Sequence, residues 1–119
     1  MVITRVASSF KRQSKALIKK YPSLKEEIEV LLDNLEKKPN TGVLIGNFVS
    51  FEAYKIRIAI KSKGKGKSSG ARVITLVLLN TIGEDTYLWL AAIYDKSDKS
   101  RISDTELLLL AKELTNEWE

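Results

Sequence analysis

Three basic residues near the middle of the chain have the spacing of neighbours on a pair of strands. Lys55 and Arg57 are two residues apart in an alternating segment, and Arg72 opens the next apolar run. Residues two apart on a strand share a face, arginine offers phosphate oxygens a planar fork of donors, and lysine offers a mobile point charge. No acid falls within residues 54–72, which favours phosphate binding over a merely solvated sheet face. We therefore predict that this group binds and polarises a phosphodiester.

The segment that follows the first of these strands consists of Gly, Ser and Lys only, over residues 62–70, which is typical of a loop. We expect its lysines and the one before it to bind a nucleic-acid backbone by counterion release; they are Lys61, Lys63, Lys65 and Lys67. A plain hairpin tip is the alternative. A P-loop is excluded, because Lys61 occupies the position of its first glycine and a strand rather than a helix follows.

Two groups near or after the end of the last predicted strand, residues 86–95, admit a functional and a structural interpretation. Tyr94 could stack on a base, whereas Tyr87 and Trp89 are expected to be packed. Four acids could together form a Mg²⁺ cluster, namely Asp95, Asp98, Asp104 and Glu106. Helix capping accounts for the last two of them, so we predict no metal site.

Composition limits the chemistry further. The 119 residues include 20 Lys and Arg against 15 Asp and Glu, a formal net charge of +5, and they include no His and no Cys. This length predicts a single domain over residues 1–119. The absence of His and Cys excludes imidazole catalysis, thiolate nucleophiles, disulfides and ordinary zinc sites. Catalysis, if any, must come from Lys, Arg, Tyr, Ser, Thr or carboxylates.

The charge is distributed unevenly along the chain. Residues 1–20 contain six basic residues and no acid, residues 54–72 contain seven and no acid, and the acids fall mainly within 26–36 and 95–119. A polyanion is therefore the expected partner of the positive side. The sequence contains no signal peptide and no apolar stretch long enough to span a bilayer, so we expect a cytoplasmic protein without a membrane partner.

Hydrophobic periodicity predicts an α+β fold of order β-α-α-β-β-β-α. Its expected strands cover 2–6, 54–61, 73–79 and 86–95; its helices run from about Ser8 to Lys20, from Ser23 to the stop at Lys38-Pro39-Asn40, and from Ser103 onward. Residues 41–52 are irregular and could include a short strand. We expect two N-terminal helices and a C-terminal helix on one face of a small, mainly antiparallel sheet, with the basic residues on the other face.

Polar residues mark the expected helix starts. Ser8 or Ser9 is the predicted N-cap of the first helix, and Ser23 with Glu26 forms a predicted capping box for the second. A second capping box, Ser103 with Glu106, is predicted for the last helix. Leu108 and Leu109 add to the apolar face of this helix and offer a possible docking site for a partner.

Five short motifs follow one another along the chain: Phe10 with the basic helix after it, Lys19–Leu24, Tyr54–Arg57, Gly70–Ile74 and Ile93–Ser97. In their order and spacing they resemble the RelE/ParE superfamily of toxins from type II toxin–antitoxin systems, nearest to its HigB-like or RelE-like branch. The resemblance extends over almost the whole chain and agrees with the predicted order of elements.

The resemblance implies an endoribonuclease that cuts mRNA, commonly in the ribosomal A site, and thereby inhibits translation and growth. It implies a small DNA-binding antitoxin, encoded nearby, as the partner, with mRNA and the ribosome as further partners. It implies no metal or other cofactor, because the ribose 2′-OH attacks the adjacent phosphate while cationic side chains stabilise the charge. ParE-like inhibition of DNA gyrase and non-catalytic nucleic-acid binding are the alternatives.

By position, the resemblance assigns catalytic roles to the basic strand residues Lys55, Arg57 and Arg72, and Lys96 lies where a basic residue follows the last strand. Lys55 could act as a general base if burial and neighbouring cations lower its pKa, and the arginines would stabilise phosphate. The family's Arg after the last strand and the Tyr beyond it correspond here to Ser97 and Ile102-Ser103. The residues that could substitute are Lys96, Lys99, Arg101 and Tyr94.

Overall fold

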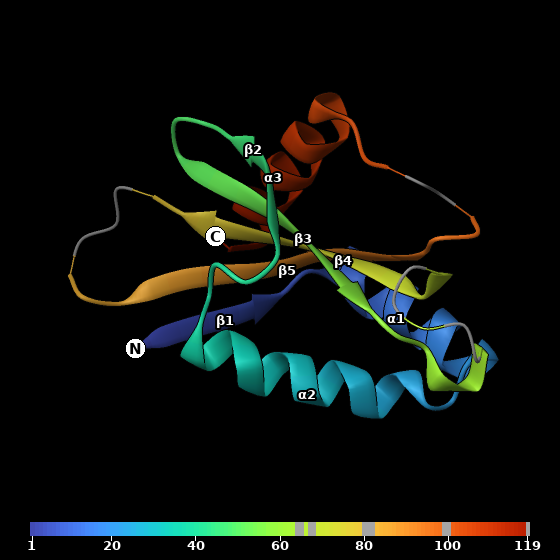
Figure 1. The fold of residues 1–119 in the computed structure, drawn as a ribbon. Helices are drawn as coiled ribbons and strands as arrows, with labels where there is room; N and C mark the ends of the chain where they lie inside the picture. Colours follow the sequence, from blue (N-terminus) through green and yellow to red (C-terminus); the bar gives the residue numbers. More distant parts are fainter. Residues whose placement is uncertain (64–65, 67–68, 80–82, 99–100, 119) are drawn as a thin grey trace.

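The computed structural model describes residues 1–63, 66, 69–79, 83–98 and 101–118, which form an α+β fold (Figure 1). Along the chain the elements are β1 (Val2–Val6), α1 (Ser8–Lys20), α2 (Leu24–Lys37), β2 (Val43–Asn47), β3 (Phe51–Ile58), a 3-10 turn (Lys61–Lys63), β4 (Ala71–Leu78), β5 (Thr86–Asp95) and α3 (Asp104–Trp118). The predicted fold class is confirmed, and β2 is a short strand within the segment 41–52. None of the described helices is both long enough and apolar enough to cross a membrane.

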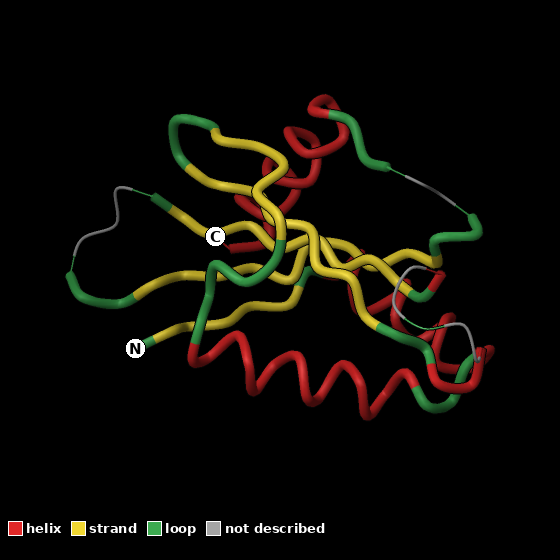
Figure 2. The backbone as a smooth tube through the Cα atoms, viewed as in Figure 1, coloured by secondary structure: helices red, strands yellow, loops and turns green. Residues whose placement is uncertain are grey.

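One five-stranded sheet runs through the middle of the molecule, with the helices around it (Figure 2). Its order is β1-β5-β4-β3-β2, in which β1 pairs with β5 in parallel and the other pairs are antiparallel. The central strand is β4, and its residues from Ala71 to Val77 are all buried. This explains why β4 is apolar on both parities, because a strand covered on both faces buries every side chain.

The strand that carries Lys55 and Arg57 begins and ends earlier than predicted. It covers Phe51–Ile58 rather than residues 54–61, because Phe51 to Ala53 also pair with the end of β4. Beyond Ile58 the chain leaves the sheet and forms the 3-10 turn. The predicted alternation itself is confirmed, since the even-numbered residues from Tyr54 to Ile58 are buried and Arg57 is exposed.

The helix α2 covers one face of the sheet with an apolar stripe. Leu24, Ile28, Leu31 and Leu35 recur at helical spacing and are all buried. They belong to the same core cluster as Ile56 and Ile58 of β3. At about 25 cal/mol per Å² of apolar surface, each such leucine or isoleucine stabilises the fold by about 1.5–3 kcal/mol.

The helix α1 takes the place of a strand along part of β5. Because β1 pairs with β5 only as far as Leu90, the next backbone groups of β5 have no strand partner on that side. Ser9 Oγ donates to Ala91 O at 2.8 Å, and Gln13 Oε1 accepts from Ile93 N at 3.0 Å.

The predicted N-cap of α1 at Ser8 or Ser9 is therefore wrong. The N-cap is Ala7, without a side-chain capping bond, because the Ser9 hydroxyl is buried against β5.

The helix α3 is the exception to the predicted single helical layer. Gly46 pairs with Ala53, which shares a face with Lys55 and Arg57, and a methyl group built on Gly46 would lie 3.2 Å from Leu107 Cδ1 of α3. This helix therefore packs on the face opposite α2, as Figure 1 shows. The reason is that β4 is apolar on both faces and needs cover on both.

The predicted capping box of α3 is confirmed, since Glu106 N donates to Ser103 Oγ at 3.2 Å and Ser103 N donates to Glu106 Oε1 at 3.3 Å.

Candidate nucleic-acid interface

Three neighbouring strands bring two arginines and a tyrosine into one row. Arg57 of β3 pairs with Arg72 of β4, which in turn pairs with Tyr94 of β5. Directly paired residues on adjacent strands lie on the same face. Lys55 lies two residues from Arg57 on that face, so the three basic residues that the sequence grouped together do share one surface. Like charges placed directly opposite each other are unfavourable, so this row favours an anion between or above the arginines.

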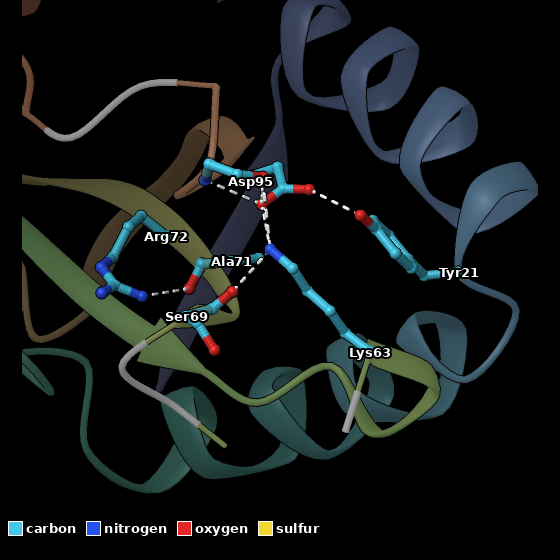
Figure 3. A network of polar contacts seen from close by, with 7 residues as sticks. Tyr21, Lys63, Ser69, Ala71, Arg72 and Asp95 are labelled. Atoms are coloured by element: carbon cyan, nitrogen blue, oxygen red, sulfur yellow. Dashed lines mark hydrogen bonds and ion pairs between the residues drawn. The ribbon is translucent and has the colours of Figure 1, made fainter. Parts of the chain in front are cut away.

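The two arginines of the row differ in exposure. Arg57 is exposed, whereas only 2% of Arg72 is exposed, and the Arg72 guanidinium donates to Ala71 O at 3.3 Å (Figure 3). Burial lowers the pKa of Arg72, and the nearby charge of Arg57 lowers it further, while Tyr94 acts in the opposite direction. An arginine remains protonated throughout the physiological range. Arg57 is thus placed to contact a ligand directly, and Arg72 supplies positive charge from beneath it.

Tyr94 ends the row and is a phenol that stays protonated. Burial raises its pKa; the charge of Arg72 lowers it, and the carboxylate of Glu106 on α3 raises it. With Gln13 and Ile102, Tyr94 lines a cavity of about 230 Å³ between α1, β5 and α3. The Tyr94 hydroxyl is buried beside Arg72, and a neutral phenol there can donate a proton to an alkoxide that reaches it. Trp89, earlier on the same strand, is buried as predicted.

A cleft beside the row contains two further cations. It has a volume of about 650 Å³, and its lining includes Lys55 from β3 and Arg101 from the segment before α3. Arg101 is exposed, and it is one of the residues considered as a substitute for the family's missing arginine. Asp104 also lines this cleft, at the first turn of α3. The row and the cleft together form the basic surface, which we define as Lys55, Arg57, Arg72, Tyr94 and Arg101.

Lys63 is not available for nucleic acid, contrary to its predicted role. Its ammonium group donates to Asp95 Oδ1 at 2.7 Å and to Ser69 O at 2.7 Å (Figure 3). It also donates to Ser97 Oγ at 3.3 Å. A lysine has three N–H donors, and all three are used inside the protein. Lys63 therefore connects the start of the β3–β4 loop, the end of that loop and the exit of β5.

Asp95 is the centre of this network. Its carboxylate is fully buried and also accepts from Tyr21 Oη at 2.9 Å and from Ser97 N at 3.0 Å. Burial alone would raise the pKa of Asp95, but the hydrogen bonds from Lys63, Ser97 and Tyr21 outweigh it and hold that pKa well below its usual range. The buried carboxylate is therefore ionised and paired with Lys63.

This pairing predicts acid sensitivity. A carboxyl group whose pKa is depressed by folding stabilises the protein above its unfolded pKa of about 4, and the stabilisation is lost as the pH falls toward the folded value. We expect the free energy of unfolding to fall below about pH 4 with a slope from Asp95 of up to about 1.4 kcal/mol per pH unit. Urea titrations between pH 5 and pH 2 measure this slope, and the variant Asp95→Asn should lose that part of it. An equal slope in the variant would contradict this account.

A second set of contacts attaches the same loop to α2. Ser62 Oγ donates to Ser23 Oγ at 2.7 Å, and Ser23 N donates to Ser62 Oγ at 3.2 Å. The predicted capping box of Ser23 with Glu26 is therefore wrong, because Ser23 makes no side-chain capping bond.

The ammonium group of Lys61 lies 3.6 Å from the Glu27 carboxylate, and the Lys61 side chain is 72% exposed, so the charge of Lys61 remains accessible to a ligand. Lys65 and Lys67 lie outside the described residues.

Two of the four acids considered as metal ligands have other partners. Asp95 is paired with Lys63, and Glu106 caps α3. Within the described part of the chain, no group of three or more His, Cys, Asp or Glu side chains could hold a metal ion.

Lys96, one of the predicted catalytic residues, follows β5 directly and is exposed, and its backbone N–H donates to Gly70 O at 3.0 Å. Lys99 lies outside the described residues.

Tyr21 is the site residue that sequence reasoning missed. It is 74 residues from Asp95 in sequence, and although it lies in the motif Lys19–Leu24, nothing in that motif indicates a bond to Asp95. Comparison of the sequence with the models of known protein families finds no match, and comparison with characterised proteins finds none.

Proposed function

We propose that this protein is the toxin of a toxin–antitoxin module and acts as an endoribonuclease on mRNA, on the ribosome, thereby inhibiting translation. The observation that carries the proposal is the row of Arg57, Arg72 and Tyr94, with Lys55 on the same face. Two adjacent cations suit a phosphodiester whose negative charge grows during reaction, and a protonated phenol beside them suits a leaving alkoxide. The resemblance to the RelE/ParE superfamily points to the same chemistry.

The proposed reaction is an intramolecular transfer that needs no metal. The ribose 2′-oxygen gives its proton to solvent water and forms a bond to phosphorus, and the bond from phosphorus to the 5′-oxygen breaks. Arg57 and Arg72 stabilise the extra negative charge on the phosphate oxygens, and Tyr94 gives its proton to the 5′-oxygen. The products are a 2′,3′-cyclic phosphate and a 5′-hydroxyl. Lys55 and Arg101 hold the flanking phosphates along the cleft.

Expression in cells tests the proposal. The wild-type protein should arrest growth and create new mRNA 5′ ends, and Arg57→Ala should create few or none. Arg12→Ala is the matched control, since it removes an exposed arginine of α1 that does not belong to the basic surface. Growth arrest with intact mRNA would contradict the proposal. Arrest with DNA damage and inhibited supercoiling would select the gyrase alternative, and salt-sensitive RNA binding without arrest or cleavage would select the non-catalytic one.

Tyr94→Phe tests the proton donor separately. Because a general acid contributes about 10²–10⁴-fold, we expect cleavage to slow by that factor while RNA binding changes little. The measurement is the single-turnover rate on a labelled RNA, compared with the dissociation constant from filter binding. Tyr87→Phe is the control, since it removes a hydroxyl from the same strand outside the row. A cleavage rate for Tyr94→Phe within threefold of wild type would exclude Tyr94 as the donor.

A further inference from the structure

A cavity beside the basic surface has a different lining from the rest of that surface. It is the cavity of about 230 Å³ between α1, β5 and α3 that Tyr94 lines. The residues that α3 contributes recur at helical spacing and form one stripe; they are Glu106, Leu109, Leu110 and Glu113. This stripe lies next to the one that contains Leu107 and Leu114, which are buried in the core. The helix is therefore held by one stripe and turns the other toward the cavity.

The charged residues that line this cavity, in the described part of the chain, are both acids. They are Glu106 and Glu113, and no lysine or arginine is among the lining residues described. The protein as a whole has a formal net charge of +5, and the cleft on the other side of Ile102 is lined by Lys55 and Arg101. Two carboxylates without a cation attract positive charge and repel phosphate. The cavity therefore suits a different ligand from that of the basic surface.

The uncharged groups of the lining also suit a cation. Gln13 Oε1 accepts one hydrogen bond, from Ile93 N at 3.0 Å, and an amide oxygen has a second lone pair that can accept another. Tyr94 supplies an aromatic ring, and the face of such a ring attracts an ammonium or guanidinium group. The remaining lining is aliphatic, namely Ala92, Ile102, Leu109 and Leu110. A ligand that matches all of these groups carries a positive charge on an apolar chain.

The cavity is small and can be reached from solvent. Leu109 is 57% exposed and Glu113 is exposed, so both lie at its mouth. Pockets for drug-sized ligands have volumes of about 300–1,000 Å³, so this cavity suits a smaller molecule.

We propose that this cavity binds a small organic cation, namely an ammonium group on a short, branched aliphatic chain. The chain would contact Ile102, Leu109 and Leu110, and the ammonium group would donate to the carboxylates of Glu106 and Glu113. An anionic ligand would meet like charge in this cavity. An uncharged apolar ligand would remove water from the two carboxylates without replacing its hydrogen bonds.

The test uses isoamylamine as the probe, with isoamyl alcohol and isovalerate as controls that have the same branched chain without charge and with negative charge. We expect the amine to shift the methyl signals of Ile102, Leu109 and Leu110 in NMR spectra of the full chain. Because hydrogen bonds to charged groups contribute about 1.5–3 kcal/mol, its dissociation constant should be lower than that of the alcohol by about tenfold or more. Isovalerate should not bind. Equal binding of the amine and the alcohol, or shifts of other methyl signals only, would overturn the proposal.

Two matched pairs of variants locate the amine. Glu113→Gln removes one charge with little change of shape and should weaken binding of the amine by about tenfold, whereas Glu29→Gln removes an exposed charge of α2 outside the cavity and should not. Leu109→Ala should weaken binding of both the amine and the alcohol. Leu108→Ala, at a neighbouring position that is 49% exposed and does not line the cavity, should change neither. Equal effects within either pair would overturn the proposal.

Two competitors distinguish a free amine from other occupants. A leucyl-arginine dipeptide with blocked ends should bind more weakly than isoamylamine, and an RNA oligonucleotide should not displace the amine. Tighter binding of the dipeptide would overturn the proposal in favour of a side chain from a partner protein, and displacement by RNA would overturn it in favour of the RNA itself. The proposal concerns binding alone, so it stands or fails independently of RNA cleavage.

Discussion

Replacing Arg57 with alanine is expected to slow RNA cleavage by about 10²–10³-fold, the usual effect of removing one donor that stabilises developing negative charge. Arg57 is exposed on β3, so its loss should leave the fold intact. The measurement is single-turnover cleavage of a labelled mRNA in the presence of ribosomes, with thermal unfolding as the check on folding. A rate within threefold of wild type would remove Arg57 from the mechanism.

Arg72 extends this test to the buried half of the row. Arg72→Lys keeps a positive charge but lacks the planar fork of donors, so we expect an intermediate loss of cleavage, smaller than that of Arg72→Ala. Arg12→Ala, on α1, removes the same side chain from an exposed surface and should cleave RNA at the wild-type rate. Equal rates for all three variants would remove Arg72 from the mechanism.

Replacing Lys63 with methionine is expected to lower the free energy of unfolding by about 3–5 kcal/mol, the usual cost of leaving a buried charge without its partner. Methionine keeps the length of the side chain but leaves the Asp95 carboxylate with its other donors only, Tyr21 and Ser97. Urea unfolding at neutral pH measures the change. A loss below about 1 kcal/mol would show that Asp95 does not depend on Lys63.

Lys61→Met is the matched control for this change. Lys61 forms an exposed pair with Glu27 at 3.6 Å, and exposed pairs contribute about 0–1 kcal/mol. The double variant Lys63→Met with Asp95→Asn should recover part of the lost stability, because it removes the uncompensated charge. Failure to recover any stability would mean that Lys63 acts by packing rather than by charge.

Local patterns predicted the elements and part of the basic surface. The alternation around Lys55 and Arg57 shows in a few residues of sequence, and so does the capping box of Ser103 with Glu106. In each case the determining contacts lie within one element or between neighbouring residues, so periodicity alone carries the information.

Contacts between distant segments could not be predicted in this way. Lys63 stands among other lysines in a Gly/Ser-rich loop, and nothing local distinguishes it, because its partner Asp95 is 32 residues away. Ser9 looks like an N-cap until β5 is seen to lack a strand partner beside it. An apolar stripe on α3 predicts burial but does not select one of two apolar faces of a sheet.

These contacts also relate the network to the basic surface. Asp95 directly follows Tyr94 on β5 and pairs with Ala71, the neighbour of Arg72. The buried pair of Lys63 and Asp95 therefore fixes the end of the sheet at which the row lies. A stable, ionised Asp95 would keep Arg72 and Tyr94 in register with each other.

The chemistry of the cut ends tests the central claim most directly. Purified protein is incubated with an mRNA, with and without ribosomes, and with the same mRNA carrying a 2′-O-methyl group at the cleavage site. We predict that the unmodified mRNA is cut to a 2′,3′-cyclic phosphate and a 5′-hydroxyl, and that the methylated site is not cut. Cleavage at the methylated site, or intact mRNA under both conditions, would contradict the proposed function.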